Sequence, residues 1–574
     1  MRTSTDKQDG SQQGSIHSQG GDVPAPAMSI ETTSNGAPKA ALTWTAEEER
    51  TLVKKLDWNL MPLLWVLFML SFLDRSNIGN ANTAGMSKDL GMDGDQYQWL
   101  LTIFYIGYAL GQPTMLLWKA VPPHILVAVL TFCWGAFALL QPTARWGGLM
   151  ALRLLLGVAE TAFSPGVTFF LSFFYGRREV GLRQGCGYFA ADTGSDDNRI
   201  LTFPSSPASS LCSPHFILLN STFSSLYAGA APVASAYAGA LAYGITQIRH
   251  SSIATWKLLF LIEGAPAILA VPLAYFFLAD RPSKARFLTE REKEIAVARA
   301  ERDGRTGREG GLKSKGVWAG LKDPKAYFCA LVYFSCNVSY SSLPVFLPTI
   351  LADMGFSSIR AQGLSAPPYL ASFLVIITCC YLSDRIGDRS IFMIPLALIG
   401  GIGYIILATV ESTGVRYFAI YLCACGIFPV IGLMLPFTAS MHEDDSRRGA
   451  GFLILNLIGQ CGPFLGTRMY PSSDKPYYVK GMAVSAAFMF FAAFLIASLR
   501  LILMYQNRRL DARYGFVDPK ASYHSAYGFA AGRGATYDEQ QMKGAAEVEE
   551  EQVEREERRR GREEGENPEW RFLL

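Results

Sequence analysis

Long apolar stretches separated by short polar or charged segments repeat along most of this 574-residue chain. Most are close to the 20 or so residues that an α-helix needs to cross the hydrocarbon core of a bilayer. Six stretches precede a hydrophilic segment and six follow it, so the pattern predicts an all-α membrane protein with twelve transmembrane helices in two halves. The predicted spans are Trp58–Ile78, Trp99–Trp118, Ile125–Leu140, Gly147–Tyr175, Leu226–Ile245, Trp256–Leu278, Ala326–Leu351, Gly363–Leu382, Ile391–Val410, Val415–Thr438, Ala450–Tyr470 and Gly481–Tyr505.

Basic residues lie mainly in alternate connections between these spans. Thirteen Lys and Arg residues fall between Arg281 and Lys325, and Arg177 with Arg178 marks another connection of the same parity. Because basic loops stay on the cytosolic side, both termini and the central loop are predicted to be cytosolic. The expected organisation is a disordered tail (1–56), an N-terminal six-helix half (57–278), a central loop (279–324), a C-terminal half (325–505) and a charged tail (506–574).

One polar, Ser- and Pro-rich stretch, residues 186–225, interrupts the N-terminal half before the fifth span. Joining Gly185 directly to Leu226 would give an uninterrupted span with its basic flank intact. The stretch is therefore read either as a surface insertion or as a translated intron, and the two alternatives stay open. In the central loop, Leu288–Arg302 has an amphipathic helix pattern with Thr289 as its N-cap, typical of a solvated linker helix.

Composition excludes several classes of function. Only 18% of residues are charged, whereas soluble domains carry about a quarter. The ten cysteines show neither metal-ligand nor paired spacing, and the net charge of +3 gives no indication of nucleic-acid binding. No nucleophile motif, His pair or Walker loop is present, so we expect no enzyme activity, no metal and no cofactor.

Ionisable residues within predicted spans are the main candidates for chemistry, because each costs about 2.5–3.5 kcal/mol at mid-membrane on insertion scales. Asp74 and Arg75 end an apolar run in the first span and are followed by a polar face. They fit a helix that lines a wet pathway; the alternative is an interfacial helix end from which Arg75 reaches the headgroups.

Arg153 and Glu160 in the fourth span are seven residues apart and so share one helix face. The functional interpretation is an anion-binding arginine beside an acid whose protonation depends on whether that arginine is occupied. The alternative is a structural network of buried ion pairs.

Other polar residues in or near the spans are weaker candidates. Glu263, in the sixth span, is read evenly as a structural contact or a cavity residue, and Arg468 as an outer-gate or loop residue. Two polar pairs at i and i+4 fit either substrate contact or helix packing. A cytosolic gate is predicted in the loop YLSDRIGDRS. The paired residues are Tyr333 with Asn337 and Asn456 with Gln460; the gate residues are Asp384, Arg385 and Arg389.

The layout and the DRxGxR loop resemble the major facilitator superfamily. LDRSNIGNA, RLLLGVAETAFSPGVTFFLSFFYGRREVGLR, WKLLFLIEG and FLTEREKEIA resemble its anion:cation symporter branch, in particular fungal allantoate-permease-like members. IGQCGPFLGTRMYPSSDKPYYVKGM is similar to a subgroup with nicotinate and related carboxylate permeases, and the ending NPEWRFLL is similar to that group too. Two features depart from the pattern: GQPTMLLWKAVPPH lacks the Asp-Arg-x-Gly-Arg motif, and residues 186–225 have no family counterpart.

The resemblance implies proton-coupled symport of a small organic anion by alternating access, such as nicotinate, pantothenate, allantoate or tartrate. It implies proton coupling through Asp74 and Glu160 and substrate binding through Arg75 and Arg153. The spacing of the two polar pairs adds Tyr333, Asn337, Asn456 and Gln460 as further candidate binding residues. The expected partners are the anion, protons and the lipid bilayer, and the expected form is a monomer in the plasma membrane. The alternatives are an uncoupled facilitator or exchanger, or a sensor that binds without transport.

Overall fold

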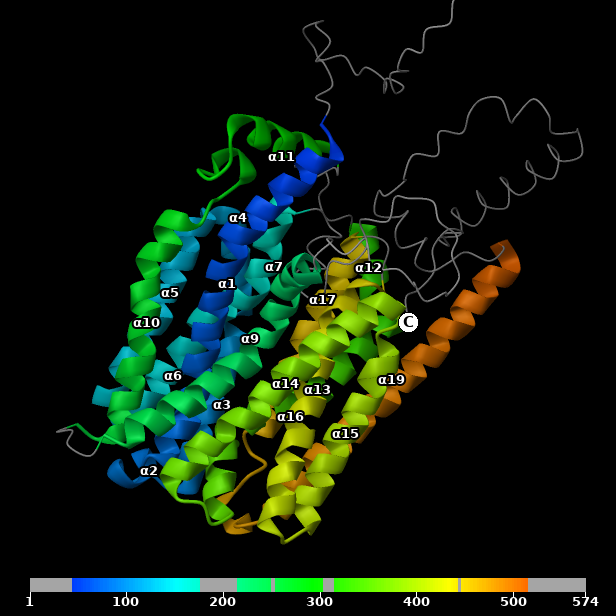
Figure 1. Cartoon of the computed structure of the whole chain (residues 1–574). Helices are drawn as coiled ribbons and strands as arrows, with labels where there is room; N and C mark the ends of the chain where they lie inside the picture. Colours follow the sequence, from blue (N-terminus) through cyan, green and yellow to red (C-terminus); the bar gives the residue numbers. More distant parts are fainter. Residues whose placement is uncertain (1–43, 176–213, 249–252, 303–313, 442–444, 515–574) are drawn as a thin grey trace, which may run out of the picture. The chain divides into compact units, whose positions relative to one another are not determined.

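The computed structural model describes residues 44–175, 214–248, 253–302, 314–441 and 445–514 (Figure 1). Every regular element within these ranges is a helix. By packing, the chain divides into Met1–Ala46 and Glu47–Leu574, and the long helices belong to the second unit. Most of the predicted insertion and both ends of the chain lie outside the described residues.

The N-terminal half begins with a helix that is longer than its apolar run. Helix α1 starts at Ala46, within the predicted tail, and three glutamates in its first turn complement the helix dipole. The fifth long helix likewise starts at Pro214 rather than at Leu226. The helices of this half are α1 (Ala46–Thr83), α2 (Met86–Asp89), α3 (Gly94–Leu110), α4 (Leu117–Ala120), α5 (Pro123–Leu140), α6 (Trp146–Thr161), α7 (Phe163–Phe174), α9 (Pro214–Thr246) and α10 (Thr255–Phe277).

The central loop and the C-terminal half follow the same design of long apolar helices joined by short connections. Two central-loop helices precede the second half, and its fifth helix is broken into α17 and α18. The elements are α11 (Glu290–Arg302), α12 (Ser314–Leu321), α13 (Pro324–Asp353), α14 (Ser358–Ile386), α15 (Ser390–Thr409), α16 (Thr413–Ala439), α17 (Asp445–Gly459), α18 (Gly462–Gly466) and α19 (Val479–Tyr514).

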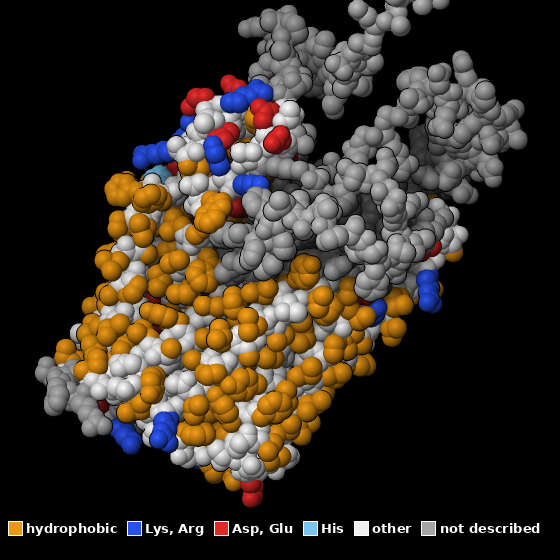
Figure 2. Space-filling model, in the orientation of Figure 1, with side chains coloured by type: hydrophobic (Ala, Val, Ile, Leu, Met, Phe, Trp, Pro, Cys, Tyr) orange, Lys and Arg blue, Asp and Glu red, His pale blue; other side chains and the backbone are white. Residues whose placement is uncertain are grey.

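Each of the twelve predicted spans coincides with one helix or with two or three consecutive helices. Within the described ranges, nine helices are long and apolar enough to cross a membrane. The three predicted spans that are not among these nine fall on α3, on α6 with α7, and on α9. On the face drawn in Figure 2, hydrophobic side chains cover the long helices, whereas charged side chains gather towards the two ends.

The fourth predicted span is two helices because the chain breaks at Ala162. Pro165, in the first turn of α7, has no backbone N–H to donate to the preceding turn. The indole Nε1 of Trp118 donates a 2.7 Å hydrogen bond to the Ala162 carbonyl at the break. A Cβ at Gly166 would overlap that indole ring, so only glycine leaves room for it. The break is therefore closed by a side chain from α4.

The predicted linker helix in the central loop forms with the predicted cap. The Thr289 hydroxyl accepts from the Glu292 N–H at 3.3 Å, and the Glu292 carboxylate accepts from the Thr289 N–H at 2.8 Å, which is a capping box. The same helix, α11, is attached to the start of α1 by the ion pairs Lys55–Glu292 and Arg299–Glu49. The start of α1 and the central-loop helix α11 therefore lie at the same end of the helical bundle.

The two halves pack closely along α9 and α14. Small residues allow this approach: a Cβ at Gly239 would meet Ser365, and one at Gly363 would be within 3.0 Å of the Tyr243 ring. At the end opposite α11, hydrogen bonds link α1 to α14: Ser358 Oγ donates to the Thr83 carbonyl at 2.7 Å, and Gln362 donates to the Asn80 carbonyl at 3.1 Å. The halves are therefore in contact at that end.

Candidate functional site

Asp74 and Arg75 lie inside the bundle. Helix α1 continues past them to Thr83, and only 2% of the Asp74 surface is exposed. The Arg75 side chain is 18% exposed and turns towards α6. The interfacial alternative does not fit this geometry, because neither residue is at a helix end and Arg75 has a partner within the protein.

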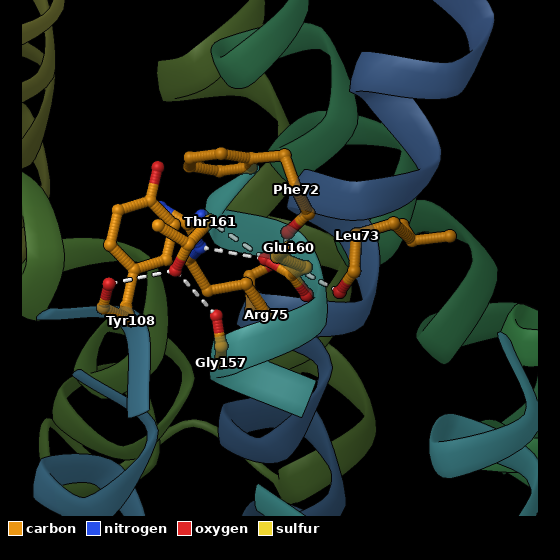
Figure 3. Close-up of polar contacts among 8 residues, drawn as sticks. Phe72, Leu73, Arg75, Tyr108, Gly157, Glu160 and Thr161 are labelled. Atoms are coloured by element: carbon orange, nitrogen blue, oxygen red, sulfur yellow. Dashed lines mark hydrogen bonds and ion pairs between the residues drawn. The ribbon is translucent and has the colours of Figure 1, made fainter. Parts of the chain in front are cut away.

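That partner is Glu160 on α6. Nη2 of Arg75 lies 3.1 Å from Oε2 of Glu160, and Nε lies 3.4 Å from the same oxygen (Figure 3). The Glu160 side chain is fully buried, so the pair is shielded from water on the carboxylate side. A charge-assisted contact in such surroundings is strong while both partners are present, and leaves a costly lone charge when one is removed.

Aromatic rings surround the Arg75 guanidinium. Its central carbon lies 5.0 Å from the ring centre of Tyr108, 5.2 Å from that of Phe104 and 5.8 Å from that of Phe72. Such contacts stabilise a cation and hold its plane in a set direction. The signal for this cage was present in the sequence, because Phe104 and Tyr108 are four residues apart in the second predicted span, but aromatic residues are common in apolar helices.

Close packing of α3 against α6 places Glu160 opposite Arg75. Gly157 lies so near the Phe104 carbonyl that an added Cβ would overlap it. One turn on, the Thr161 hydroxyl is 2.7 Å from the carbonyls of both Tyr108 and Gly157, and therefore joins the two helices (Figure 3). The carboxylate is thus held by backbone contacts on either side of it.

Arg153 occupies the same helix as Glu160 and is also buried, with 1% of its surface exposed. Its guanidinium lies 6.0 Å from the Phe260 ring of α10, and its Nε and Nη2 have no hydrogen-bond partner among the described residues. The sequence spacing suggested Arg153 as the neighbour of Glu160, whereas the direct ion pair is the one with Arg75. Arg153 acts on Glu160 and Asp74 through its field rather than by contact.

Two further carboxylates in this half are buried without a partner. Neither oxygen of Asp74 on α1 and neither oxygen of Glu263 on α10 has a hydrogen-bond partner within the described ranges. Glu263 is 1% exposed, so it lies in the interior rather than at a lipid-facing helix break. These two acids, with Glu160 and Arg153, concentrate ionisable chemistry in the N-terminal half.

Of the two polar pairs predicted in the C-terminal half, one contacts a neighbouring helix. The Asn337 amide donates to the Gly459 carbonyl at 3.1 Å, from α13 to α17, and Tyr333 packs on Gly459. The Asn456 amide donates to the Phe452 carbonyl of its own helix at 2.9 Å. Gln460 is partly buried at the end of α17. For Asn337 this geometry favours the packing alternative, since its amide already has a backbone partner.

The structure describes part of the loop that is predicted to form a cytosolic gate. The Arg389 guanidinium donates to the Pro436 carbonyl at 3.0 Å, which joins the start of α15 to α16. The side chains of Asp384 and Arg385 lie outside the described part of the chain. Sequence reasoning missed Asp388, which binds Arg500 of α19 at 2.6 and 2.7 Å and accepts from the Ile391 N–H at the start of α15. The pair is 112 positions apart, so no local pattern indicates it.

Arg468 lies at the opposite end of the bundle and bridges the halves. Its Nη1 is 2.8 Å from Oδ1 of Asp95, and its guanidinium lies 4.1 Å from the centre of the Trp99 ring, both in α3. Nearby, the Thr102 and Thr467 hydroxyls are 3.0 Å apart. Of the two interpretations of Arg468, this position favours the outer gate.

A metal site receives no support from the described residues. No three His, Cys, Asp or Glu side chains are placed together so as to hold an ion in the ranges that the structure covers. What the geometry can do is electrostatic: a paired arginine can exchange a carboxylate of the protein for that of a ligand, and a buried acid can take up or release a proton.

Comparison with known proteins places this arrangement in a family. The family model described as Major Facilitator Superfamily matches residues 64–195 and 212–467 and leaves out 196–211, which lie within the predicted insertion. The MFS-type transporter efuF of Hormonema carpetanum is 30% identical over 469 residues, covering 80% of this chain and 87% of that protein. The high-affinity nicotinic acid transporter of Saccharomyces cerevisiae is 29% identical, covering 86% and 83% respectively.

Solved structures share the fold at low sequence identity. A bacterial homologue of the human lysosomal transporter Spinster, in an inward-facing conformation, gives a TM-score of 0.55 with 14% identity and covers 80% of this chain and 99% of that one. The proton:xylose symporter XylE gives 0.56 with 13% identity, covering 78% and 96%. With the apolar helices and buried charges described above, these matches show that the chain belongs to the major facilitator superfamily and is a multi-pass integral membrane transporter.

Proposed function

We propose that this transporter carries a small organic anion together with protons by alternating access. The observation that carries the proposal is the buried ion pair between Arg75 and Glu160, 3.1 Å apart. A structural pair needs no second cation nearby, yet Arg153 is buried on the same helix with unsatisfied donors among the described residues. When the buried Asp74 and Glu263 carry protons, the two arginines and the single ion-paired carboxylate leave one positive charge for a ligand to neutralise.

The coupling follows from competition for Arg75. A substrate carboxylate that binds the guanidinium displaces Glu160, which then remains buried without its partner. An uncompensated buried charge costs several kcal/mol, so the displaced carboxylate takes up a proton. Asp74, next to Arg75 in the chain, is the second proton acceptor, and Arg153 attracts the anion. The anion and the protons therefore bind together.

The surroundings of Arg75 support a flat, carboxylate-bearing substrate. Tyr108 and Phe104 present ring faces beside the guanidinium, and Tyr340 of α13 meets Phe72 edge-on with ring centres 5.7 Å apart. Rings of this kind stack on planar acids. The similarity to a protein named as a nicotinic acid transporter makes nicotinate the first candidate, ahead of pantothenate, allantoate and tartrate.

The proposed topology has twelve spans, with α3, α6–α7 and α9 added to the nine helices that meet the length and hydropathy criteria. Both termini and the central loop are cytosolic in this proposal, the halves are 57–278 and 325–505, and a monomer functions in the plasma membrane. The basic loops are the basis for the orientation. On this orientation, the contact of Arg468 with Asp95 closes the outer side.

The cytosolic gate in this scheme comprises Asp384, Arg385 and Arg389, and we add the ion-paired Asp388 and Arg500 to it. Tyr333, Asn337, Asn456 and Gln460 form the neutral wall across from the N-terminal charges. Alternation then requires the outer contacts to separate while the cytosolic contacts close. Both sets of contacts join helix ends. A small rotation of the halves displaces atoms there more than it does at the middle of the helices.

The test is uptake of the four radiolabelled acids by yeast cells that lack their own permeases for them, across a range of external pH. We expect one acid to accumulate from acid medium and an uncoupler to abolish that accumulation. Glu160→Gln should abolish proton-driven accumulation, because the amide cannot exchange a proton. The matched control is Glu411→Gln, which changes an exposed loop glutamate.

Three results would contradict the proposal. Uptake that persists with the uncoupler would identify an uncoupled facilitator or exchanger. Binding without uptake would identify a sensor. Unchanged accumulation in Glu160→Gln would remove Glu160 from the coupling mechanism.

A further inference from the structure

One ion pair joins the two halves at the end of the bundle opposite α11. Nη1 of Arg468, which follows α18, lies 2.8 Å from Oδ1 of Asp95 in the first turn of α3. None of the other ion pairs between described residues joins the N-terminal half to the C-terminal half. Among these residues, the charge that holds this end closed is therefore concentrated in one contact.

Neutral contacts surround this ion pair along α3. The Thr467 and Thr102 hydroxyls are 3.0 Å apart. A Cβ at Gly94 would overlap Oγ of Ser472, so the start of α3 lies close against the segment that carries Arg468. Contacts of this kind act only at short range, whereas the ion pair can be broken by any anion that binds the guanidinium more tightly.

The ion pair is open to water and uses only part of the guanidinium. The Arg468 side chain is 29% exposed and the Asp95 side chain is 70% exposed, so water screens their attraction. Among the described residues, Asp95 accepts from Nη1 alone, whereas a guanidinium can hold a carboxylate through two parallel N–H donors. A carboxylate from solution can therefore replace that of Asp95 and gain one hydrogen bond.

Trp99, one turn after Asp95 on α3, holds the guanidinium in place. The central carbon of the Arg468 guanidinium lies 4.1 Å from the centre of the Trp99 ring, where the ring face attracts a cation. This attraction does not require Asp95, so it persists when the ion pair breaks. The Trp99 side chain is also exposed, and its apolar surface beside the guanidinium favours an acid that carries an aromatic ring.

We propose that Arg468 and Trp99 form an outer binding site for a planar carboxylate, and that the acid opens the outer closure by taking Arg468 from Asp95. The inference rests on the proposed transport of an organic anion and adds a first binding step to it. One cation is paired with one carboxylate before and after the exchange. After the exchange, however, the ion pair no longer joins the halves.

The outer exchange differs from the one proposed at Arg75 in what happens to the displaced carboxylate. Asp95 is mostly exposed, so it is released into water and needs no proton. Glu160 is fully buried, so its release from Arg75 does need one. The outer site therefore selects an anion without consuming a proton, and the inner site couples that anion to the proton.

The first test compares two variants that break the same ion pair, using whichever of the four acids the wild type takes up. Asp95→Asn removes the competing carboxylate, so the KM for uptake should fall by about two- to fivefold. Arg468→Gln removes the binding group, so the KM should rise by about tenfold or more. A closure without an anion site would be loosened by both variants alike. KM shifts in the same direction would therefore overturn the inference.

Lys475→Gln is the matched control. Lys475 binds Asp353 at 3.3 Å at the same end of the bundle, but both residues belong to the C-terminal half. The variant should leave the KM unchanged, and a KM increase as large as that in Arg468→Gln would overturn the assignment to Arg468. Arg468→Lys keeps the charge without the two parallel donors, so its KM should lie between those of the wild type and Arg468→Gln.

The second test needs no transport. Nitroxide labels are placed at Lys88 and Glu411, which are exposed on the two halves, and their separation in the purified full-length protein is measured by pulsed electron paramagnetic resonance. Nicotinate should lengthen the distance, whereas nicotinamide, its uncharged amide, should not. Arg468→Gln should abolish the response to nicotinate. An absent response in the wild type, or equal responses to the two compounds, would contradict the outer site.

The outcomes separate the outer site from the proposed function. If the wild type accumulates none of the four acids but nicotinate still lengthens the distance through Arg468, the proposed function fails and the outer site stands. If the wild type accumulates an acid while Asp95→Asn and Arg468→Gln shift the KM in the same direction, the proposed function stands and the outer site fails. Monodisperse elution in size-exclusion chromatography establishes that the variants fold.

Discussion

The two halves of the transporter share a helical design but differ in where they bury charge. In the N-terminal half, Asp74, Arg153, Glu160 and Glu263 are all nearly inaccessible to solvent. In the described part of the C-terminal half, Arg416 is the one charged residue buried to that degree, and it packs on Tyr477 beside the start of α16.

Polar groups in the interior of the C-terminal half are mostly neutral and bind backbone. Ser372 donates to the Ala424 carbonyl at 2.9 Å, and Asn337 donates to the Gly459 carbonyl at 3.1 Å. These contacts join helices and do not change with protonation. The comparison indicates that the ionisable groups of the N-terminal half carry the charge chemistry. The C-terminal half supplies neutral side chains whose contacts do not change with protonation.

The strongest test of this difference between the halves is to remove one interior arginine from each half. Arg75→Ala leaves Glu160 buried without its partner. We therefore expect the free energy of unfolding to fall by about 3–5 kcal/mol, which lowers the ratio of folded to unfolded protein by about 100-fold or more. Uptake should become undetectable and the melting temperature should fall. Arg416→Ala should keep most of the uptake, because it removes no ion pair found among the described residues.

The double variant Arg75→Ala/Glu160→Gln provides the internal control. It removes the lone charge as well as its partner, so part of the lost thermal stability should return while uptake stays absent. If Arg416→Ala reduced uptake as much as Arg75→Ala does, the division of labour between the halves would be wrong.

An intermediate effect is expected where the halves meet. An alanine methyl at Gly79 of α1 would overlap the Val345 carbonyl of α13, so Gly79→Ala should force the halves apart at the end of the bundle opposite α11. Overpacking costs about 1–3 kcal/mol, which would shift the closed population by about 5–150-fold. Spin labels at Lys88 and Glu411, exposed on the two halves, should report longer distances.

Gly147→Ala is the matched control, because a Cβ there meets nothing within 4 Å. It should leave both the label distances and the uptake rate unchanged. Unaltered distances in Gly79→Ala would mean that the α1–α13 contact does not set the conformation of that end of the bundle.

The smallest effect is expected outside the membrane-spanning region, where α11 meets α1. Partial burial alone would raise the pKa of Glu292, but hydrogen bonds from Lys55 and Thr289 outweigh it and lower the pKa below the ordinary 4.5. Because the pKa is depressed in the folded state, the stabilisation is present at neutral pH and is lost as the pH falls through the lowered value. The Lys55 side chain is 41% exposed and therefore screened by water, so the gain is only about 0.5 kcal/mol.

Melting curves measure this prediction. Glu292→Gln should melt slightly below the wild type at neutral pH, and the difference should disappear in acid once the Glu292 carboxylate is protonated in the folded protein. Glu290→Gln, which alters an exposed pair with Lys293 on the same helix, should show no such dependence. A constant difference at both pH values would assign the effect to packing rather than to charge.

The order of helices was predictable because apolar runs and their interruptions are local. The Thr289 cap was predictable for the same reason, and it is confirmed at atomic detail. The spans themselves were less certain: α3 ends at Leu110, and the fourth span breaks at Ala162, so neither has one continuous helix across its predicted length.

Pairings between helices were not predictable from the sequence. The spacing of Arg153 and Glu160 indicated a shared face, but the close approach of α1, α3 and α6 makes Arg75 the direct partner of Glu160. Asp95 with Arg468 is separated by 373 positions, and Asp388 with Arg500 by 112. Only the packing of the helices determines which charges meet, so burial at mid-helix identified the candidates without identifying their partners.

The junction between α6 and α7 has a consequence for the history of this chain. Trp118 donates to the Ala162 carbonyl, and Gly166 gives the indole its space. A larger residue at position 166 would expel the ring, and loss of the ring would leave a carbonyl in need of another donor. Substitutions at positions 118 and 166 are therefore expected to depend on each other, and a relative with tryptophan and glycine at the corresponding positions is expected to have a divided fourth helix as well.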